Sequence, residues 1–219
     1  MKTAIVTGAN GFVGSALVRE LLHHDYTVLA ADLAGHQENL PNDDRVSFVP
    51  LELAKIKELA HRVPEQRYDI LFHLAWAGSA GPARADTALQ LQNAQWTVDV
   101  LRTAKELGCK RVLCAGSIME HETMAAAYTQ GNRPGPGYIY GGGKLIAHVM
   151  CMSVAAQLGI ELVWPEITNA YGPGERSPRL VNTTVQKCLR GEAPQFTAGT
   201  QNYDFVYIDD VARAIRLIG

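Results

Sequence analysis

The sequence has few cysteines and no excess of charge of either sign. Only four cysteines occur in 219 residues, and none lies in a Cys-x-x-Cys pair or in the spacing of a zinc finger. A chain of this length with so few cysteines is not a disulfide scaffold, so we expect free thiols in a reducing cytoplasm and no metal. The 20 basic and 22 acidic residues leave a net charge of −2, which argues against nucleic acid or an anionic membrane as a partner.

Signals for export and for membrane insertion are also missing. The chain passes from Met1 and Lys2 directly into a strand-like segment, without the charged region, apolar run and cleavage site of a signal peptide. No apolar stretch is expected to approach the roughly 20 residues that span a bilayer. The sequence therefore predicts one main globular core that acts on small molecules.

Short β-branched apolar runs alternate with stretches of helical period along much of the chain. Strands are predicted at residues 3–7, 27–31, 46–50, 70–73, 111–115 and 161–164, and helices at about 12–24, 55–63, 88–107 and 138–158. Because these strands are apolar along their whole length, they fit a parallel sheet that is covered by helices on both faces. The pattern predicts an α/β fold with a Rossmann-like, doubly wound parallel sheet.

Two segments rich in Gly, Ala and Pro, residues 76–86 and 119–137, interrupt this alternation. Both follow the carboxyl end of a predicted strand, so we expect loops that form walls of a substrate site. From residue 172 the pattern changes to a loop, a helix near 178–190, a strand near 204–208 and a helix that has barely begun at Gly219. We expect one domain over residues 1–171 and the start of a second, cut short, over residues 172–219.

A glycine-rich segment, Gly8-Ala9-Asn10-Gly11-Phe12-Val13-Gly14, lies between the first predicted strand and the first predicted helix. Glycines allow a tight turn and close approach of the backbone to a ligand, and a helix N-terminus offers N–H groups to a pyrophosphate. A turn without a ligand is the alternative. Asp32 ends the second strand, where its carboxylate would accept hydrogen bonds from an adenosine ribose and repel a 2′-phosphate; a capping or turn aspartate is the alternative. Asp32 therefore favours NAD over NADP as the cofactor.

Tyr140 and Lys144 stand four residues apart in a predicted helix, and therefore on one face of it. A phenol with a pKa near 10 is a poor base, but Lys144 and a bound nicotinamide would favour the phenolate and make Tyr140 a general acid/base. Ser117 follows the strand at 111–115 and would orient the same substrate oxygen. Three glycines separate Tyr140 from Lys144 and are costly in a helix, so we expect that something compensates for their low helix propensity. A chance pair and a turn serine are the alternatives.

Taken in order, several motifs resemble the extended short-chain dehydrogenase/reductases, the NAD-dependent epimerase/dehydratase family. They are GANGFVG at 8–14, HLAWAG at 73–78, Ser117, Tyr140 with Lys144, NAYGP at 169–173 and DFVYIDD at 204–210. The resemblance implies a cofactor site formed by Gly8, Asn10, Gly11, Phe12, Val13, Gly14, Asp32, Glu52, Leu53, Ala75, Trp76, Ala77, Asn93, Tyr140, Lys144 and Ile167. It implies substrate contacts from Ser117, Ile118, Met119, Asn169 and Arg179, with Ser117, Tyr140 and Lys144 as the catalytic residues.

The chain also departs from this family. Ser117-Ile118-Met119 stands where the dehydratases tend to carry Thr-Asp-Glu, so dehydration is disfavoured. Glu166 and Tyr203 stand where the family commonly has arginines, the second of which often helps to hold a nucleotide diphosphate. The candidates for that charge here are Arg176, Arg179 and Lys187.

The resemblance implies reversible hydride transfer on a nucleotide-linked sugar, by an epimerase or a 4-ketoreductase. A non-catalytic NAD-binding sensor or scaffold is the alternative. A homodimer is implied through the helices at 88–107 and 138–158; the expected contacts are Trp96, Val100, Leu101, Met150 and Val154. His73 is expected to be a packed core residue, and His121 with Glu120 and Glu122 to form a solvated loop rather than a metal site.

Overall fold

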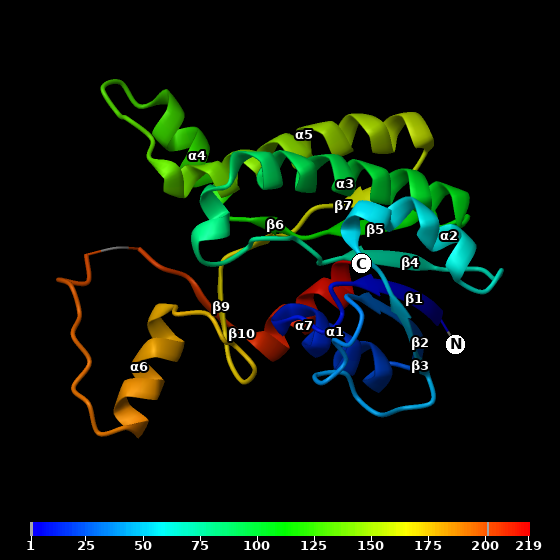
Figure 1. Ribbon diagram of the computed structural model, residues 1–219, viewed down its shortest axis with the longest axis horizontal. Coiled ribbons are helices and arrows are strands. Elements are labelled where there is room, and N and C mark those ends of the chain that lie inside the picture. Colours follow the sequence, from blue (N-terminus) through cyan, green and yellow to red (C-terminus); the bar gives the residue numbers. More distant parts are fainter. Residues whose placement is uncertain (1, 201) are drawn as a thin grey trace.

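The computed structural model describes residues 2–200 and 202–219, and its centre is a six-stranded sheet in the order β3-β2-β1-β4-β5-β7 (Figure 1). The strands are β1 (Lys2–Thr7), β2 (Tyr26–Asp32), β3 (Val46–Pro50), β4 (Ile70–His73), β5 (Arg111–Cys114) and β7 (Glu161–Val163). Every neighbouring pair is parallel. The order reverses between β1 and β4, as in a doubly wound sheet, so the predicted fold class is confirmed.

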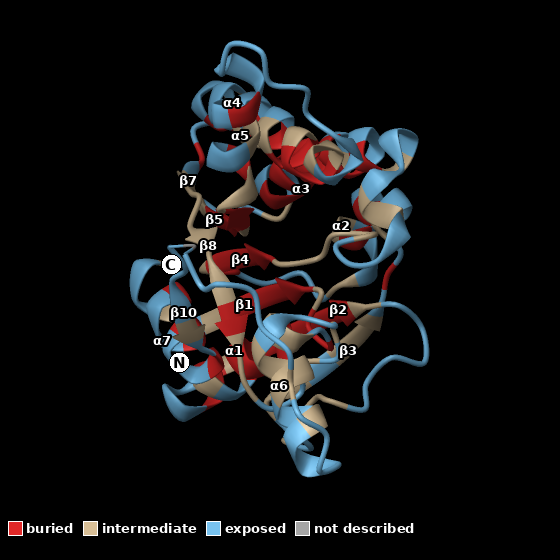
Figure 2. Cartoon of the chain, turned by 90° about the vertical axis from the view of Figure 1, so that its left-hand side faces the viewer, coloured by how far each residue is buried: buried red, intermediate tan, exposed pale blue. Residues whose placement is uncertain are grey.

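Helices cover both faces of this sheet. α1 (Phe12–His23) and α7 (Ile208–Ile218) lie on one face, and α3 (Thr87–Glu106), α5 (Ile139–Leu158) and the short α2 (Leu59–Arg62) lie on the other (Figure 1). Successive residues of β1 enter different cores: Ala4 and Val6 pack toward α1 and α7, whereas Ile5 packs toward α3 and α5. Figure 2 shows the buried residues concentrated in the central strands and on the inner sides of α3 and α5.

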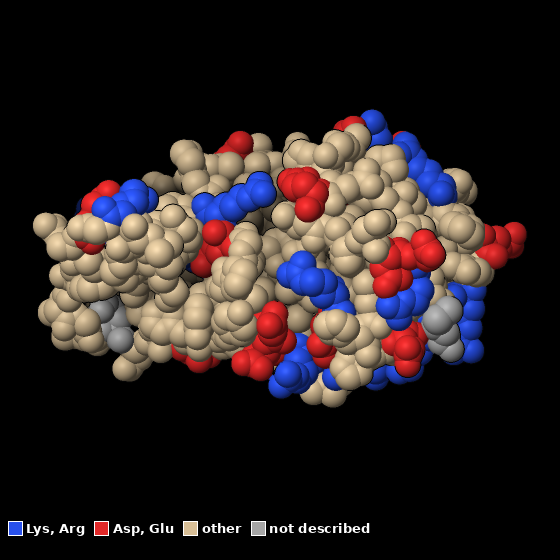
Figure 3. All heavy atoms as spheres, turned by 90° about the horizontal axis from the view of Figure 1, so that it is seen from below, with Lys and Arg blue, Asp and Glu red and all other residues tan. Residues whose placement is uncertain are grey.

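Shorter elements complete the fold around the carboxyl edge of the sheet. They are η1 (Leu53–Glu58), η2 (Pro82–Ala85), β6 (Gly116–Ser117), α4 (Met119–Tyr128), η3 (Pro136–Tyr138), β8 (Glu166–Ile167), β9 (Asn169–Tyr171), α6 (Leu180–Leu189) and β10 (Phe205–Tyr207). β6 pairs with β8, and β9 pairs with β10. On the face seen in Figure 3, basic and acidic side chains lie interspersed, in keeping with the small net charge of −2.

Two expectations about local structure were wrong. Residues 119–137 do not form a continuous loop, because α4 occupies the first part of this segment; its run of Met, Glu and Ala residues has high helix propensity. The last helix is not barely begun: α7 has 11 residues, and its apolar face, with Ile208, Val211 and Ile215, is buried in the core against α1. Although α7 lies within residues 172–219, it therefore packs with the first core; the division at residue 171 stays a prediction.

The glycines of α5 allow neighbouring helices to approach it closely. A Cβ atom at Gly141 would overlap Thr123 Oγ1 and would lie 2.5 Å from Met119 O, both in α4. A Cβ atom at Gly143 would lie 3.0 Å from Gln90 Cβ in α3. These contacts are the compensation that the low helix propensity of glycine demands.

By length and composition, the segment Pro136–Leu158 is apolar enough to cross a membrane, with a mean hydropathy of 1.2. The expectation that no stretch approaches this length was therefore wrong for α5. The buried face of α5 packs against α3 and carries the buried side chains of Tyr140 and Lys144. Such a face is typical of a core helix, which satisfies the same length and hydropathy criteria.

Candidate active site

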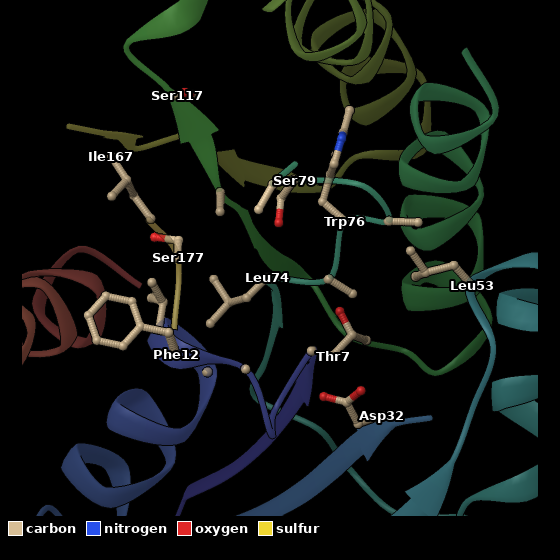
Figure 4. Close-up of a pocket in the computed structure, with 18 of the residues that line it drawn as sticks. Thr7, Phe12, Asp32, Leu53, Leu74, Trp76, Ser79, Ser117, Ile167 and Ser177 are labelled. Atoms are coloured by element: carbon tan, nitrogen blue, oxygen red, sulfur yellow. The ribbon is translucent and has the colours of Figure 1, made fainter. Parts of the chain in front are cut away.

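A cavity of about 600 Å³ opens at the carboxyl edge of the sheet, beside the switch between β1 and β4 (Figure 4). Thr7, Asp32 and Ser117, which line it, lie at or just beyond the ends of β1, β2 and β5. Strands that run in the same direction end at the same edge, which brings together residues that are far apart in the sequence.

The glycine-rich turn forms one wall of this cavity, and two of its glycines cannot be replaced without a clash. Gly8 has a φ of 71°, and a Cβ atom on it would lie 2.7 Å from Ala75 N. A Cβ atom on Gly14 would overlap the carbonyl oxygen of Gly8. The turn thus packs directly on the loop after β4 and on the start of α1.

The N-terminus of α1 opens into the cavity. Gly11, Phe12, Val13 and Gly14 line it, Gly11 is the N-cap residue, and the first turn has neither a side-chain cap nor an acidic residue. The first N–H groups of a helix lack partners within the helix, and they carry the positive end of its dipole. This end of α1 fits an anionic group such as a pyrophosphate.

Asp32 lies at the far side of the turn, at the end of β2. Its Oδ2 accepts a hydrogen bond from Asn10 N at 2.8 Å, and its Oδ1 accepts one from Leu33 N at 2.8 Å. The carboxylate is thus held by two backbone amides, as the turn alternative requires, and it also lines the cavity. Each oxygen keeps a second lone pair, so the side chain can still accept hydrogen bonds from two ribose hydroxyls.

Ser117, Tyr140 and Lys144 meet at the other end of the cavity, and all three are buried. The Ser117 hydroxyl lies close enough to the phenol to lower the pKa of Tyr140 by hydrogen bonding. Lys144 Nζ donates a hydrogen bond to Ala115 O at 2.7 Å. The positions of these side chains follow from two elements: β5 with β6 carries Ser117 to the edge, and one face of α5 carries the other two residues.

Burial moves the pKa values of both titratable groups toward the neutral forms. It raises the pKa of Tyr140, against the opposing effects of the hydrogen bond from Ser117 and of the positive charge of Arg84. It lowers the pKa of Lys144 to about 8. The lysine ammonium faces Ala115 O rather than the phenol, so the expected lowering of the Tyr140 pKa by Lys144 stays a prediction.

One cation–π contact is made by the Tyr140 ring, and a second is made by the neighbouring Trp76 ring. The Arg84 guanidinium lies 4.1 Å from the centre of the Tyr140 ring. Trp76 meets Tyr140 edge to face, with ring centres 6.0 Å apart, and Lys144 Nζ lies 3.8 Å from the centre of the Trp76 ring. Trp76 Nε1 in turn donates to Gln90 Oε1 at 2.7 Å. Arg84 was missed by the sequence reasoning, because a single arginine in an expected loop carries no motif.

All of the predicted cofactor residues line the cavity except Asn10 and Asn93. Asn93 instead holds the loop after β4, since it accepts from Ala77 N at 2.9 Å and donates to Ala77 O at 2.8 Å. The side chain of Asn10 accepts from Asn39 N at 2.8 Å. These two asparagines support the cavity wall from behind rather than forming its surface.

The predicted substrate residues divide into two groups. Ser117 and Arg179 line the cavity, whereas Ile118, Met119 and Asn169 do not. The reason is local structure: α4 begins at Met119, and Asn169 is part of the β9–β10 pair. Ser79 and Ala80 also line the cavity and belong to the predicted wall at 76–86. The lining residues that the sequence reasoning did not assign to this site include Leu33, Leu51, Ala54, Leu74, Trp96, Thr168, Glu175 and Ser177. Most of these are apolar or small residues next to the motifs, and no spacing distinguishes them.

Of the three basic residues that were expected to supply charge for a diphosphate, two line the cavity. Arg176 joins Arg179 at the cavity, whereas Lys187 does not line it. Val100 and Leu101 are fully buried on the inner face of α3, so they cannot lie on a dimer surface. Trp96 lines the cavity.

His73 is a packed core residue, as predicted. It is 3% exposed, its Nδ1 lies 2.7 Å from Thr7 Oγ1, and burial lowers its pKa to about 3. The four cysteines are free thiols, and Cys109, Cys114 and Cys151 are buried.

Glu120 is not solvated, contrary to the expectation. Its side chain is 2% exposed, and its Oε1 accepts a hydrogen bond from Ser117 N at 2.9 Å. The reason is that α4 places it against β6 instead of leaving it in a loop. A buried carboxylate therefore lies directly behind the candidate catalytic serine.

The family described as "NAD dependent epimerase/dehydratase family" matches residues 4–219. The UDP-glucuronic acid decarboxylase 1 of Xenopus tropicalis is 27% identical over 228 residues, a match that covers 98% of this chain and 52% of that protein. The chain thus spans about half the length of this relative.

Two solved structures are similar in fold. A UDP-N-acetylglucosamine 4-epimerase from Methanobrevibacter ruminantium M1, in complex with UDP-N-acetylmuramic acid, has a TM-score of 0.81 and 25% identity; the match covers 99% of this chain and 72% of that one. MoeE5, in complex with UDP-glucose and NAD, has a TM-score of 0.74 and 27% identity; the match covers 98% of this chain and 71% of that one.

Proposed function

The chain belongs to the NAD-dependent epimerase/dehydratase family, and we propose that it binds NAD and transfers hydride at a carbon atom of a nucleotide-linked sugar. One observation carries the proposal: the turn from Gly8 to Gly14 and the trio Ser117, Tyr140 and Lys144 line the same cavity of about 600 Å³. A site for an anionic dinucleotide and a group able to exchange a proton are thus close to each other.

The cofactor, when bound, supplies an acceptor and donor of hydride. The N-terminus of α1 binds the diphosphate, and Asp32 accepts hydrogen bonds from the ribose hydroxyls and disfavours a 2′-phosphate. Tyr140 Oη exchanges a proton with the reacting sugar oxygen, and Ser117 Oγ orients that oxygen. The Lys144 ammonium, which already faces the cavity, supports the phenolate form once a ligand has displaced water.

The sugar is proposed to carry a nucleoside diphosphate. Arg176 and Arg179 at the cavity supply positive charge for that group. The relatives are named for UDP-sugar decarboxylation and 4-epimerisation, and we propose 4-epimerisation or 4-ketoreduction for this chain. Dehydration is disfavoured because Ile118 and Met119 offer neither an acid nor a base. An epimerase retains its cofactor on purification, whereas a reductase must exchange it.

The proposal is tested by calorimetric titration of the folded chain, freed of cofactor, with NAD⁺ and with NADP⁺. We expect NAD⁺ to bind more tightly, and Asp32→Ala to weaken it about tenfold or more, because hydrogen bonds to a charged group are lost. Asp44→Ala, a change at an exposed aspartate outside the cavity lining, is the control. Failure of the folded chain to bind either dinucleotide would reject the proposal.

A non-catalytic sensor or scaffold is the second candidate, and NAD⁺ binding alone does not exclude it. With UDP-glucuronic acid, UDP-glucose and their 4-keto derivatives as probes, an enzyme changes the absorbance of the reduced nicotinamide or the identity of the sugar. Tyr140→Phe should abolish that change while leaving NAD⁺ bound. NAD⁺ binding without turnover of any probe would favour the sensor.

We propose a homodimer that forms through the outer faces of α3 and α5. Leu91 on α3 and Ile146, Val149 and Met150 on α5 are between 40% and 56% exposed, which is unusual for four large apolar side chains on adjacent helices. Light scattering should give twice the mass of the chain, and Val149→Glu should give the monomer. A strict monomer at high concentration would reject this part of the proposal. The free thiols suit a reducing cytoplasm, which we propose as the location.

A further inference from the structure

A cluster of two carboxylates and an imidazole lies behind Ser117, outside the lining of the cavity. It consists of Glu120 from α4, His148 from α5 and Glu166 from β8. One ligand atom from each residue lies within 4.8 Å of the others. α4 lies beside the N-terminal part of α5 (Figure 1), and β8 pairs with β6, so three elements converge at this point.

Two imidazole–carboxylate pairs involve the cluster, and the second of them adds His121 from α4. His148 Nδ1 lies 2.8 Å from Glu120 Oε2, and His121 Nε2 lies 2.7 Å from Glu166 Oε2. In such a pair a proton occupies the place between nitrogen and oxygen. A divalent cation can displace the proton between His148 and Glu120, because metal ligation requires neutral imidazoles and ionised carboxylates. Two carboxylates then balance the two positive charges of the cation.

Neighbouring groups hold the ligand atoms in place. Glu120 Oε1 accepts from Ser117 N at 2.9 Å and from Trp164 Nε1 at 3.1 Å, which leaves Oε2 directed at the cluster. The His148 ring is stacked on Trp164, with ring centres 4.6 Å apart and an angle of 7° between the planes. Such supporting contacts orient ligands in metal sites.

Gly116 makes this packing possible. A Cβ atom on Gly116 would overlap the Trp164 indole and would lie 3.0 Å from Glu120 Oε1. Burying a carboxylate is costly unless hydrogen bonds and opposite charge compensate. Only glycine at position 116 leaves enough space for the buried carboxylate of Glu120 and for the Trp164 indole.

The cluster also has an opening to solvent. The side chain of Glu120 is 2% exposed, whereas those of His148 and Glu166 are 25% and 26% exposed. A cation can therefore enter from the side of His148 and Glu166 and meet the buried oxygen of Glu120 at the bottom.

We propose that Glu120, His148 and Glu166 bind one divalent transition-metal ion, with His121 supporting Glu166. A mixed imidazole and carboxylate set suits ions such as Zn²⁺, Co²⁺ and Mn²⁺ better than Ca²⁺ or Mg²⁺, which prefer oxygen ligands alone. The ion lies one side chain away from the Ser117 amide, so it stabilises the position of the candidate catalytic serine. This inference does not depend on NAD binding.

The test is calorimetric titration of the tag-free, EDTA-treated full chain with ZnCl₂, CoCl₂ and MnCl₂ in separate experiments. We expect one equivalent of at least one ion to bind, and with Co²⁺ a visible d–d absorption band that reports nitrogen and oxygen ligands. His148→Gln and Glu166→Gln should each weaken binding about 100-fold or abolish it, since losses of 10–100-fold follow even from changes outside the ligand set. Both variants keep a side chain able to form hydrogen bonds, and circular dichroism verifies their fold.

Two controls separate this site from adventitious binding. His24→Gln changes a His–Glu pair elsewhere, His24 with Glu20, to which the described residues add no third ligand, and it should leave binding unchanged. Cys188→Ser removes the exposed thiol and should also have no effect. Absence of binding for all three ions would overturn the proposal, and so would equal binding by wild type, His148→Gln and Glu166→Gln. NAD⁺ titration of the same samples reports separately on the proposed function.

Discussion

The ammonium group of Lys144 lies 3.8 Å from the centre of the Trp76 indole ring, in the wall of the cavity. The lysine is 5% exposed, and its one hydrogen bond given by the structure is to Ala115 O. A buried ammonium ion with one carbonyl partner gains from the electron-rich face of the ring. Trp76 therefore helps the chain to keep a positive charge where the proposed chemistry needs it.

This contact predicts the titration of Lys144. Its pKa is lowered from 10.5 to about 8 by burial. Trp76→Leu removes the cation–π contact and should lower this pKa further, by about 0.7–1.5 units, since the contact contributes roughly 1–2 kcal/mol. NMR of the chain with labelled lysine follows the titration, and Lys57, which is largely exposed, serves as the internal reference. An unchanged Lys144 pKa in the variant would contradict the prediction.

The lowered pKa of Lys144 also makes the free energy of unfolding depend on pH. The folded pKa of Lys144, about 8, lies below the ordinary value of 10.5. Between these values the unfolded chain binds more protons, so this lysine makes the folded state more stable as pH rises through the window.

Arg84 is predicted to facilitate ionisation of Tyr140. Its guanidinium lies 4.1 Å from the centre of the ring, and its charge opposes the rise in pKa that burial causes. Arg84→Met should therefore raise the pKa of Tyr140 further. Ultraviolet difference spectra of the phenolate, compared with those of the Tyr140→Phe variant, isolate this one tyrosine. Arg102→Met, at a half-exposed arginine that pairs with the buried Asp99 on α3, should leave the spectrum unchanged.

The glycines of α5 should differ in their tolerance of a methyl group. A Cβ atom at Gly142 meets nothing within 4 Å, so Gly142→Ala should stabilise the chain by up to about 1 kcal/mol through helix propensity. Gly141→Ala forces a Cβ atom against α4 and should destabilise the chain by about 1–3 kcal/mol. Urea unfolding measures both. Equal effects of the two substitutions would show that the close approach of α4 and α5 does not limit stability.

The buried, neutral imidazole of His73 is expected to make the folded chain less stable in acid. Its folded pKa is about 3 and its ordinary value is 6.5. As pH falls from 6.5 toward 3, His73 becomes protonated in the unfolded chain but stays neutral in the folded chain. The free energy of unfolding therefore falls by up to about 1.4 kcal/mol per pH unit. His73→Gln should lose less stability over this window, as measured by urea unfolding at several pH values. A variant whose stability falls as steeply as that of the wild type would exclude His73 as the cause.

The strands illustrate what could be predicted from the sequence. β3 and β4 begin and end where the apolar runs predict, and the other predicted sheet strands differ by one residue at one end or, for β2, at both ends. Such strands are buried on both faces, so their apolar runs stand out from neighbouring polar segments. α4 was missed for the opposite reason, since its Ala and Met residues lie in a segment where Gly and Pro punctuation dominated the pattern.

By itself, the sequence determined the doubly wound class, the glycine-rich turn and the alignment of Tyr140 with Lys144, because each depends on residues close together in the chain or on a regular period. Only the tertiary structure decided that Glu120 is buried, and that it meets His148, 28 residues away, beside Glu166. It also decided that Arg84 covers the phenol. These contacts arise where α4, α5, η2 and β8 converge, and no local pattern encodes the distance between elements that pack against one another.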